Sequence, residues 1–240
     1  NRVVERTIEK VVPDTSNQKA TVITREQVRV VNSDELIVAA IDRNKASLIR
    51  IRGFPEGASE VNEGEFYGLG LVVSREGHIL TDSNLVQDSI AYRSLIDGTT
   101  VSLELVKVDR VNRLALFKAK APAGVTLNWI PATLGMEDAL RVGQSVVAIG
   151  KTDRNVIAPG TITSLSEGKV EVASSTRTVI VALETSNDPR PLSVGSIIVN
   201  TAGEVVAAYR YTSDGNGRFG TLLGAKELVA SIEGLKPAKK

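Results

Sequence analysis

The stretch GLGLVVSREGHILTDSNLV, residues 68–86, decides the fold. Its first part, GLGLVVS, and the later HILT are short runs rich in Val, Ile and Leu. The pair Glu76-Gly77 separates them, and such a pair is typical of a turn between two strands. We therefore predict two consecutive β-strands joined by a tight turn.

The same pattern of short strands extends outward from this stretch, from Gly53 to Gly224. Turn pairs such as Asp97-Gly98, Glu167-Gly168 and Ala202-Gly203 separate runs rich in Val, Ile and Thr. These runs are TVSLELVKV, LALFKA, SVVAIG, GTITSLS, KVEVAS, TVIVALE, SIIVN and EVVAAYR. Many short strands at regular spacing predict an all-β protein built as barrels or sandwiches.

Helices are expected only near the two ends of this β region. Residues Asp34–Ser47 carry apolar side chains at helical spacing, and Ser33 is a plausible N-cap. Residues Ala225–Glu233 form a short amphipathic pattern that ends at Gly234. We expect the tail, residues 234–240, to be disordered.

Residues 1–33 are expected to be a separate helical and extended segment. Val4, Ile8, Val11 and Val12 lie on one helical face, and Pro13 ends the pattern. Three interpretations stay open: an oligomerising coil, a stalk that follows a membrane anchor, and an extension that packs nowhere, since so short a helix is marginal alone.

Composition excludes several classes of site. The chain has 240 residues, 29 basic and 28 acidic, no Cys and a single His, His78. A net charge of +1 argues against a broad nucleic-acid surface. A zinc site built on Cys or several His is excluded, and the carboxylates lack EF-hand spacing. We therefore expect no metal, no cofactor and no nucleic-acid partner.

The chain resembles the chymotrypsin-fold serine proteases of the HtrA (Deg) type over about residues 34–233. The resemblance rests on stretches in the family's order. Residues 68–86 are similar to GSGVIIxxxGYILTNNHVV, and VDRVNRLALFKAK (108–120) to xDxxxDLAVLKI. LRVGQSVVAIG (140–150) with GTITSL (160–165) is similar to LxxGxxVxAIGNP and GIVSxL, and ETSNDPRPLSVGSIIVNTAGEVV (184–206) to QTDAxINPGNSGGPLxNxxGEVI.

The resemblance implies a fold and a division of the chain. The fold is a chymotrypsin-like pair of six-stranded β-barrels, at about 34–125 and 126–233, with short N- and C-terminal helices. No PDZ domain is expected after residues 225–233.

The resemblance also places the family's catalytic triad. The histidine of TNNHVV falls on Asn84, the aspartate of DLAVL on Arg113, and the serine of GNSGGP on Val194. The three residue types of a serine protease are a hydroxyl nucleophile, an imidazole base and an orienting carboxylate. The sequence therefore predicts no catalytic residue at these positions. A carboxylate such as Asp82 is expected to pair with Arg113.

The turn around the family's serine is altered as well. Its glycines fall on Leu192 and Ser196, while Gly195 is retained and Ser193 precedes Val194. Glycines here allow positive φ and close backbone approach, so we expect an altered oxyanion turn. We interpret Ser193 and Ser196 as turn hydroxyls bonded to local backbone, and His78 as a surface turn residue.

Three functions follow as hypotheses. The first is a catalytically inactive HtrA-like pseudoprotease, not an enzyme, that binds a protein or an extended peptide by strand addition. The second is a serine-type endopeptidase that uses Ser193 or Ser196. The third is a structural assembly protein of the cell envelope that associates through residues 1–33.

The resemblance implies a bacterial protein located outside the cytoplasm, in the periplasm or on the outer face of the cell membrane. No apolar run reaches the roughly 20 residues that span a bilayer. Members of the family are often tethered by an N-terminal helix, and the resemblance thus implies a membrane tether upstream of Asn1. The family also implies a homo-oligomer, a trimer.

Overall fold

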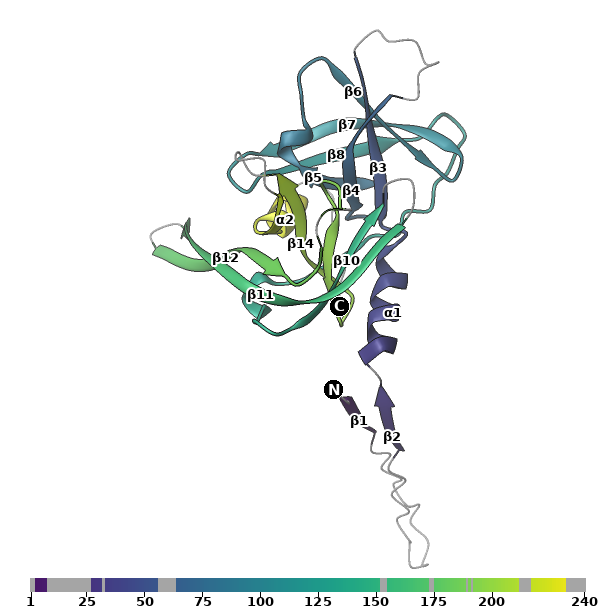
Figure 1. The fold of residues 1–240 in the computed structure, drawn as a ribbon. Helices are drawn as coiled ribbons and strands as arrows, with labels where there is room; N and C mark the ends of the chain where they lie inside the picture. The colour runs from purple at the N-terminus through teal and green to yellow at the C-terminus, as the bar shows by residue number, and fades with distance from the viewer. Residues whose placement is uncertain are drawn as a thin grey trace, which may run out of the picture.

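A computed structural model describes residues 3–7, 27–31, 33–55, 64–151, 155–172, 175–188, 190, 192–211 and 217–231. Two β-barrels stack on one another, with one helix beside them and one between them (Figure 1). The predicted all-β, chymotrypsin-like fold is confirmed. Among the described helices, none is long and apolar enough to cross a membrane.

The first barrel is closed by six antiparallel strands in the order β3-β4-β5-β8-β7-β6. Its core contains Ile51, Ile79 and Phe117, which are almost completely buried. The turn predicted at Glu76-Gly77 joins β4 to β5, with Leu71 paired to Leu80. The strands are β3 (Leu48–Pro55), β4 (Glu65–Val72), β5 (His78–Asp82), β6 (Ile90–Ile96), β7 (Thr99–Asp109) and β8 (Leu114–Lys120).

The second barrel also has six strands, in the order β13-β10-β11-β12-β15-β14, and pairing of β13 with β14 closes it. A short strand, β9 (Thr133–Leu134), joins it by parallel pairing with β14. The β11–β12 hairpin extends well beyond the barrel (Figure 1). The strands are β10 (Ser145–Lys151), β11 (Asn155–Val172), β12 (Ser175–Thr185), β13 (Ile197–Asn200), β14 (Glu204–Tyr211) and β15 (Gly217–Thr221).

Apolar side chains hold the two barrels together. Leu69 and Leu71 of β4 pack against Ile149 and Ile197 of the second barrel, and Ala40 of α1 (Ser33–Asn44) joins this cluster. Burying a Leu or Ile side chain contributes about 1.5–3 kcal/mol, so this cluster stabilises the junction between the barrels. The C-terminal helix α2 (Ala225–Ala230) packs against the same junction through Leu228 and Ala225.

The N-terminal segment differs from the prediction. Residues Val3–Thr7 form β1, which pairs antiparallel with β2 (Gln27–Val31), where a helix was expected over residues 1–12. The β-branched residues of VVERT and QVRVV favour strands, and pairing with a second strand satisfies backbone groups that a short helix would satisfy only marginally. The helical face at Ile8, Val11 and Val12 lies outside the described residues, as does the tail, residues 234–240.

Candidate functional site

The end of strand β5 carries a buried carboxylate. Asp82 is 4% exposed, and its Oδ1 accepts a hydrogen bond of 2.9 Å from the backbone N–H of Asn84. Asp82 thereby caps the short 3₁₀ helix η1 (Ser83–Leu85), as a short acidic side chain commonly does at a helix start. Asn84 itself is exposed.

Arg113 lies beside this carboxylate, as the sequence predicts. Its Nη2 is 3.2 Å from Oδ2 of Asp82, and its side chain is 30% exposed. The backbone carbonyl of Arg113 accepts a hydrogen bond from the N–H of Ser83. Arg113 has a φ of 56°, a left-handed conformation that is uncommon for a non-glycine residue. The structure therefore brings Asn84 and Arg113 together around Asp82.

Val194 and Gly195 form a turn that is clamped between the two barrels. The Val194 carbonyl accepts a hydrogen bond of 2.8 Å from the N–H of Leu69 in β4. The Gly195 N–H donates to the carbonyl of Tyr209 in β14 at 2.9 Å. Gly195 has a φ of 85°, and a Cβ built on it would lie 2.2 Å from the Leu69 carbonyl oxygen, so this position requires glycine.

The other residues of this turn are bonded to each other or packed in the core. The Ser193 N–H donates to Ser196 Oγ at 3.1 Å, and the Ser196 N–H donates to the Ser193 carbonyl at 2.9 Å. Ser196 is completely buried, as is nearly all of Leu192, which packs in the second barrel. The Ser193 and Gly195 N–H groups are thus bonded within the protein, and the expected turn role of Ser196 Oγ is confirmed.

The three segments meet at a small cavity. A space of about 20 Å³ is lined by Asp82, Gly195 and Arg210, among others. It lies next to the carboxylate that pairs with Arg113, and Gly195 follows Val194 in the clamped turn. Asp82 and Gly195, which come from two segments that the sequence analysis singled out, therefore lie beside one cavity.

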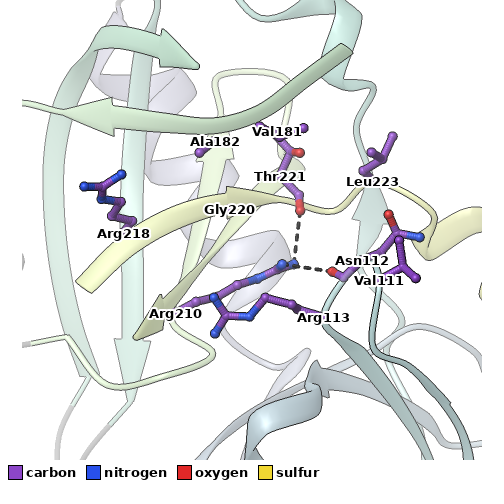
Figure 2. A pocket seen from close by; sticks show the side chains of 10 residues that line it. All are labelled: Val111, Asn112, Arg113, Val181, Ala182, Arg210, Arg218, Gly220, Thr221 and Leu223. Carbon is purple, nitrogen blue, oxygen red and sulfur yellow. Dashed lines mark hydrogen bonds between the residues drawn. The ribbon is translucent and has the colours of Figure 1, made fainter. Parts of the chain in front are cut away.

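Arg210 is a member of this site that sequence reasoning missed. Its Nη1 donates to the Asn112 carbonyl at 3.0 Å and its Nη2 to the Thr221 carbonyl at 3.1 Å (Figure 2). Burial lowers its pKa, and the neighbouring Asp82 acts in the opposite direction. A basic residue in the apolar strand EVVAAYRY was the signal that could have revealed it, because a buried charge requires specific partners.

His78 does not lie where the sequence predicts. It is 7% exposed, at the first position of β5, rather than on the surface. Its Nδ1 is 2.8 Å from Ser74 Oγ, and Ser74 Oγ also accepts a bond from the His78 N–H. These contacts satisfy the polar atoms that burial would otherwise leave unpaired. Burial, and then the charge of Lys118, lower the pKa of His78.

Comparison with known proteins assigns the family. Residues 68–207 match the model of the trypsin-like peptidase domain, which is more than half of the chain. The chain therefore belongs to the trypsin-like peptidase domain family, and its protease domain is of the HtrA type. The Deg5 crystal structure has the same fold, with a TM-score of 0.60 and 20% identity over 83% of this chain and 93% of that one.

Two curated relatives support the HtrA type. A probable periplasmic serine endoprotease DegP-like protein of Halomonas elongata is 33% identical over 156 residues, 63% of this chain and 30% of that protein. Serine protease HTRA1 of Xenopus laevis is 29% identical over 142 residues, 58% of this chain and 30% of that protein. The chain spans less than a third of the length of these relatives.

These comparisons correct one prediction from the sequence. The chain was expected not to be an enzyme, because of the residues at positions 84, 113 and 194. The family is one of peptidases, and the relatives are named serine proteases. That expectation was wrong because it inferred the activity of the whole protein from the identity of three aligned residues.

Proposed function

We propose that this chain binds an extended segment of a protein partner as an added β-strand on the edge of β14, at the junction of the barrels. Strand addition uses backbone hydrogen bonds and side-chain pockets of the host sheet. It therefore places no requirement on the residues at positions 84, 113 and 194, which we propose as the counterparts of the family's triad, with Leu192, Ser193, Gly195 and Ser196 as its altered turn.

The course of β14 is the observation that supports this proposal. On one edge, the N–H and the carbonyl of Tyr209 are bonded to Ser196 and Gly195. Backbone groups of alternate residues point to the same edge of a strand, so Tyr211 directs its N–H and carbonyl to that edge too. The β13–β14 pairing ends at Ala208, and the hydrogen bonds described on this edge end at Tyr209.

The opposite edge of β14 is already paired. Arg210 pairs with Arg218, and Tyr211 lies opposite Gly217 of β15. The backbone of Tyr211 is thereby held extended by β15, and an incoming strand would meet a preorganised edge. Preorganisation lowers the entropy cost of binding.

The test uses a reduced and carboxymethylated, permanently unfolded protein as the partner. Tyr211→Pro removes the N–H that faces the open edge. Proline is tolerated at such a position because this N–H makes no hydrogen bond with the described strands of the sheet. We expect the variant to bind about 10-fold more weakly or worse, because strand addition then lacks a backbone hydrogen bond. Tyr211→Ala keeps the N–H and should bind like the wild type, and equal binding by all three proteins would reject the edge of β14.

Peptide hydrolysis is the second candidate function, because the family is one of peptidases. Ser196 is completely buried and bonded to the Ser193 N–H, whereas Ser193 is half-buried. Ser193 is therefore the better candidate nucleophile of the turn. A fluorophosphonate probe should label the wild type and fail to label Ser193→Ala if this hydroxyl is activated, with Ser196→Ala as the matched control.

The location and assembly of the protein are part of the same proposal. The DegP-like relatives are named periplasmic, which supports a location outside the cytoplasm. The membrane tether and the trimer stay predictions. Light scattering on the chain with and without residues 1–33 tests whether that segment, which contains the β1–β2 hairpin, drives association.

A further inference from the structure

A pocket of about 280 Å³ opens between the barrels, on the side of β14 and β15 (Figure 2). It is distinct from the edge of β14 that is proposed to take a strand. Its polar side is formed by the guanidinium groups of Arg113 and Arg210, with Arg218 farther along the wall (Figure 2). Its apolar side is formed by Val111, Val181 and Leu223.

Basic side chains predominate among the charged residues that line this pocket. Three arginines line it, and none of its described lining residues is acidic. The carboxylate of Asp82, which does not line the pocket, pairs with Arg113 and caps η1. Asp82 also acts electrostatically on Arg210, which lies almost completely buried beside it.

Arg210 has N–H donors that make no hydrogen bond among the described residues. A guanidinium has five N–H donors, and Arg210 donates to two backbone carbonyls, of Asn112 and Thr221. Its buried Nε has no hydrogen-bond partner among the described residues, although the residue is only 7% exposed. Each terminal nitrogen retains a second N–H, because each makes one of the two bonds.

The backbone also leaves room for this arginine. A Cβ built on Gly220 would lie 3.1 Å from Cδ, Nε and Cζ of Arg210. The guanidinium therefore lies directly against the backbone of β15, and the carbonyls of Asn112 and Thr221 fix its plane. A guanidinium held in this way is preorganised to receive a planar carboxylate.

We propose that this pocket binds a carboxylate joined to a short aliphatic group. Arg210 and Arg113 face the carboxylate, and Val111, Val181 and Leu223 contact the aliphatic part. This chemistry is shared by small branched organic acids and by the C-terminal residue of a peptide that ends in an aliphatic side chain. The proposal does not depend on strand addition at β14.

Isothermal titration of the whole chain with N-acetyl-leucine and with N-acetyl-leucinamide tests the pocket. The two probes differ only in the carboxylate. We expect saturable binding of the acid and binding of the amide that is about 10-fold weaker or absent, because charge-assisted hydrogen bonds are lost. Equal binding of both probes, or saturable binding of neither, would overturn the proposal.

Variants then locate the site. Arg113→Gln and Arg210→Met should each weaken binding of the acid by about 10-fold or more. Arg110→Gln removes the same charge from an exposed position of the same loop that does not line the pocket, and it should bind like the wild type. A folded Arg113→Gln protein that binds the acid as tightly as the wild type would reject this pocket. Because Arg113 is partly exposed, this variant provides the test even if Arg210→Met fails to fold.

Isovalerate distinguishes the two sources of the carboxylate. Binding of isovalerate as tight as that of N-acetyl-leucine would assign the pocket to a small acid. Much weaker binding of isovalerate would assign it to the end of a peptide, whose amide group then contributes. Both results retain the carboxylate site that the acid–amide comparison establishes.

Discussion

Nη2 of Arg113 lies 3.2 Å from Oδ2 of Asp82, at the place where the two barrels meet. The side chain of Asp82 is 2% exposed and that of Arg113 is 30% exposed. The pair therefore neutralises a buried carboxylate with a charge that still reaches solvent. This relationship organises the loop before β8 around the end of β5.

Loss of this pair should destabilise the protein. Arg113→Met removes the cation that Asp82 contacts directly and leaves Arg210 as its neighbouring charge. We expect the free energy of unfolding to fall by about 1–2 kcal/mol, less than for a fully buried pair because Arg113 is partly exposed. Urea denaturation measures this change in the free energy of unfolding. Lys120→Met breaks the exposed Lys120–Glu104 pair and should cost less than about 1 kcal/mol. Equal losses in the two variants would show that burial of Asp82 is not the cause.

The clamped turn gives a second prediction. Gly195→Ala places a methyl group 2.2 Å from the Leu69 carbonyl at positive φ, so the contact between the barrels must open. We expect a loss of more than about 2 kcal/mol in the free energy of unfolding. Gly143→Ala has the same φ of 85° but nothing within 4 Å of the new Cβ, and its loss should be near 1 kcal/mol. The difference between the variants isolates the steric contact from the backbone strain, and no difference would refute the clamp.

His78 should make stability depend on pH. Burial and Lys118 lower its pKa below the ordinary value of 6.5, so in that range the unfolded chain binds more protons than the folded one. The His78 contribution is fully present above pH 6.5 and is lost as the pH falls through the lowered pKa.

The measurement compares denaturation of the wild type and His78→Gln between about pH 5.5 and 7.5. The free energy of unfolding of the wild type should rise with pH more steeply than that of the variant. His78 is the single histidine, so its imidazole signal in a proton NMR titration reports the pKa directly. A pKa at or above 6.5 would contradict the prediction.

The strands were predictable from sequence because their signals are local. Alternating apolar runs and turn pairs such as Glu76-Gly77 locate the hairpins, and the helix at Ser33–Asn44 follows from its apolar spacing. The N-terminal hairpin was missed because β1 finds its partner, Gln27–Val31, far along the chain. A helical periodicity in Val and Ile is also compatible with a strand once such a partner exists.

The site was predictable only in part, because several of its contacts join residues that are distant in the chain. The pairing of Arg113 with Asp82 followed from the aligned stretches, whereas burial of His78 depends on the hydroxyl of Ser74 in the preceding turn. Arg210 was missed because its acceptors, the carbonyls of Asn112 and Thr221, come from other strands and loops. Every residue has a backbone carbonyl, so the sequence does not show which carbonyls accept a hydrogen bond from a given side chain.

Strand addition at β14 is tested most directly by hydrogen exchange at the Tyr211 amide. The rate is measured by NMR with and without a saturating amount of the unfolded partner protein. If a segment of the partner pairs with this edge, the Tyr211 amide becomes hydrogen-bonded and should exchange at least about 10-fold more slowly. An unchanged rate at Tyr211 under saturation would contradict the proposed binding edge.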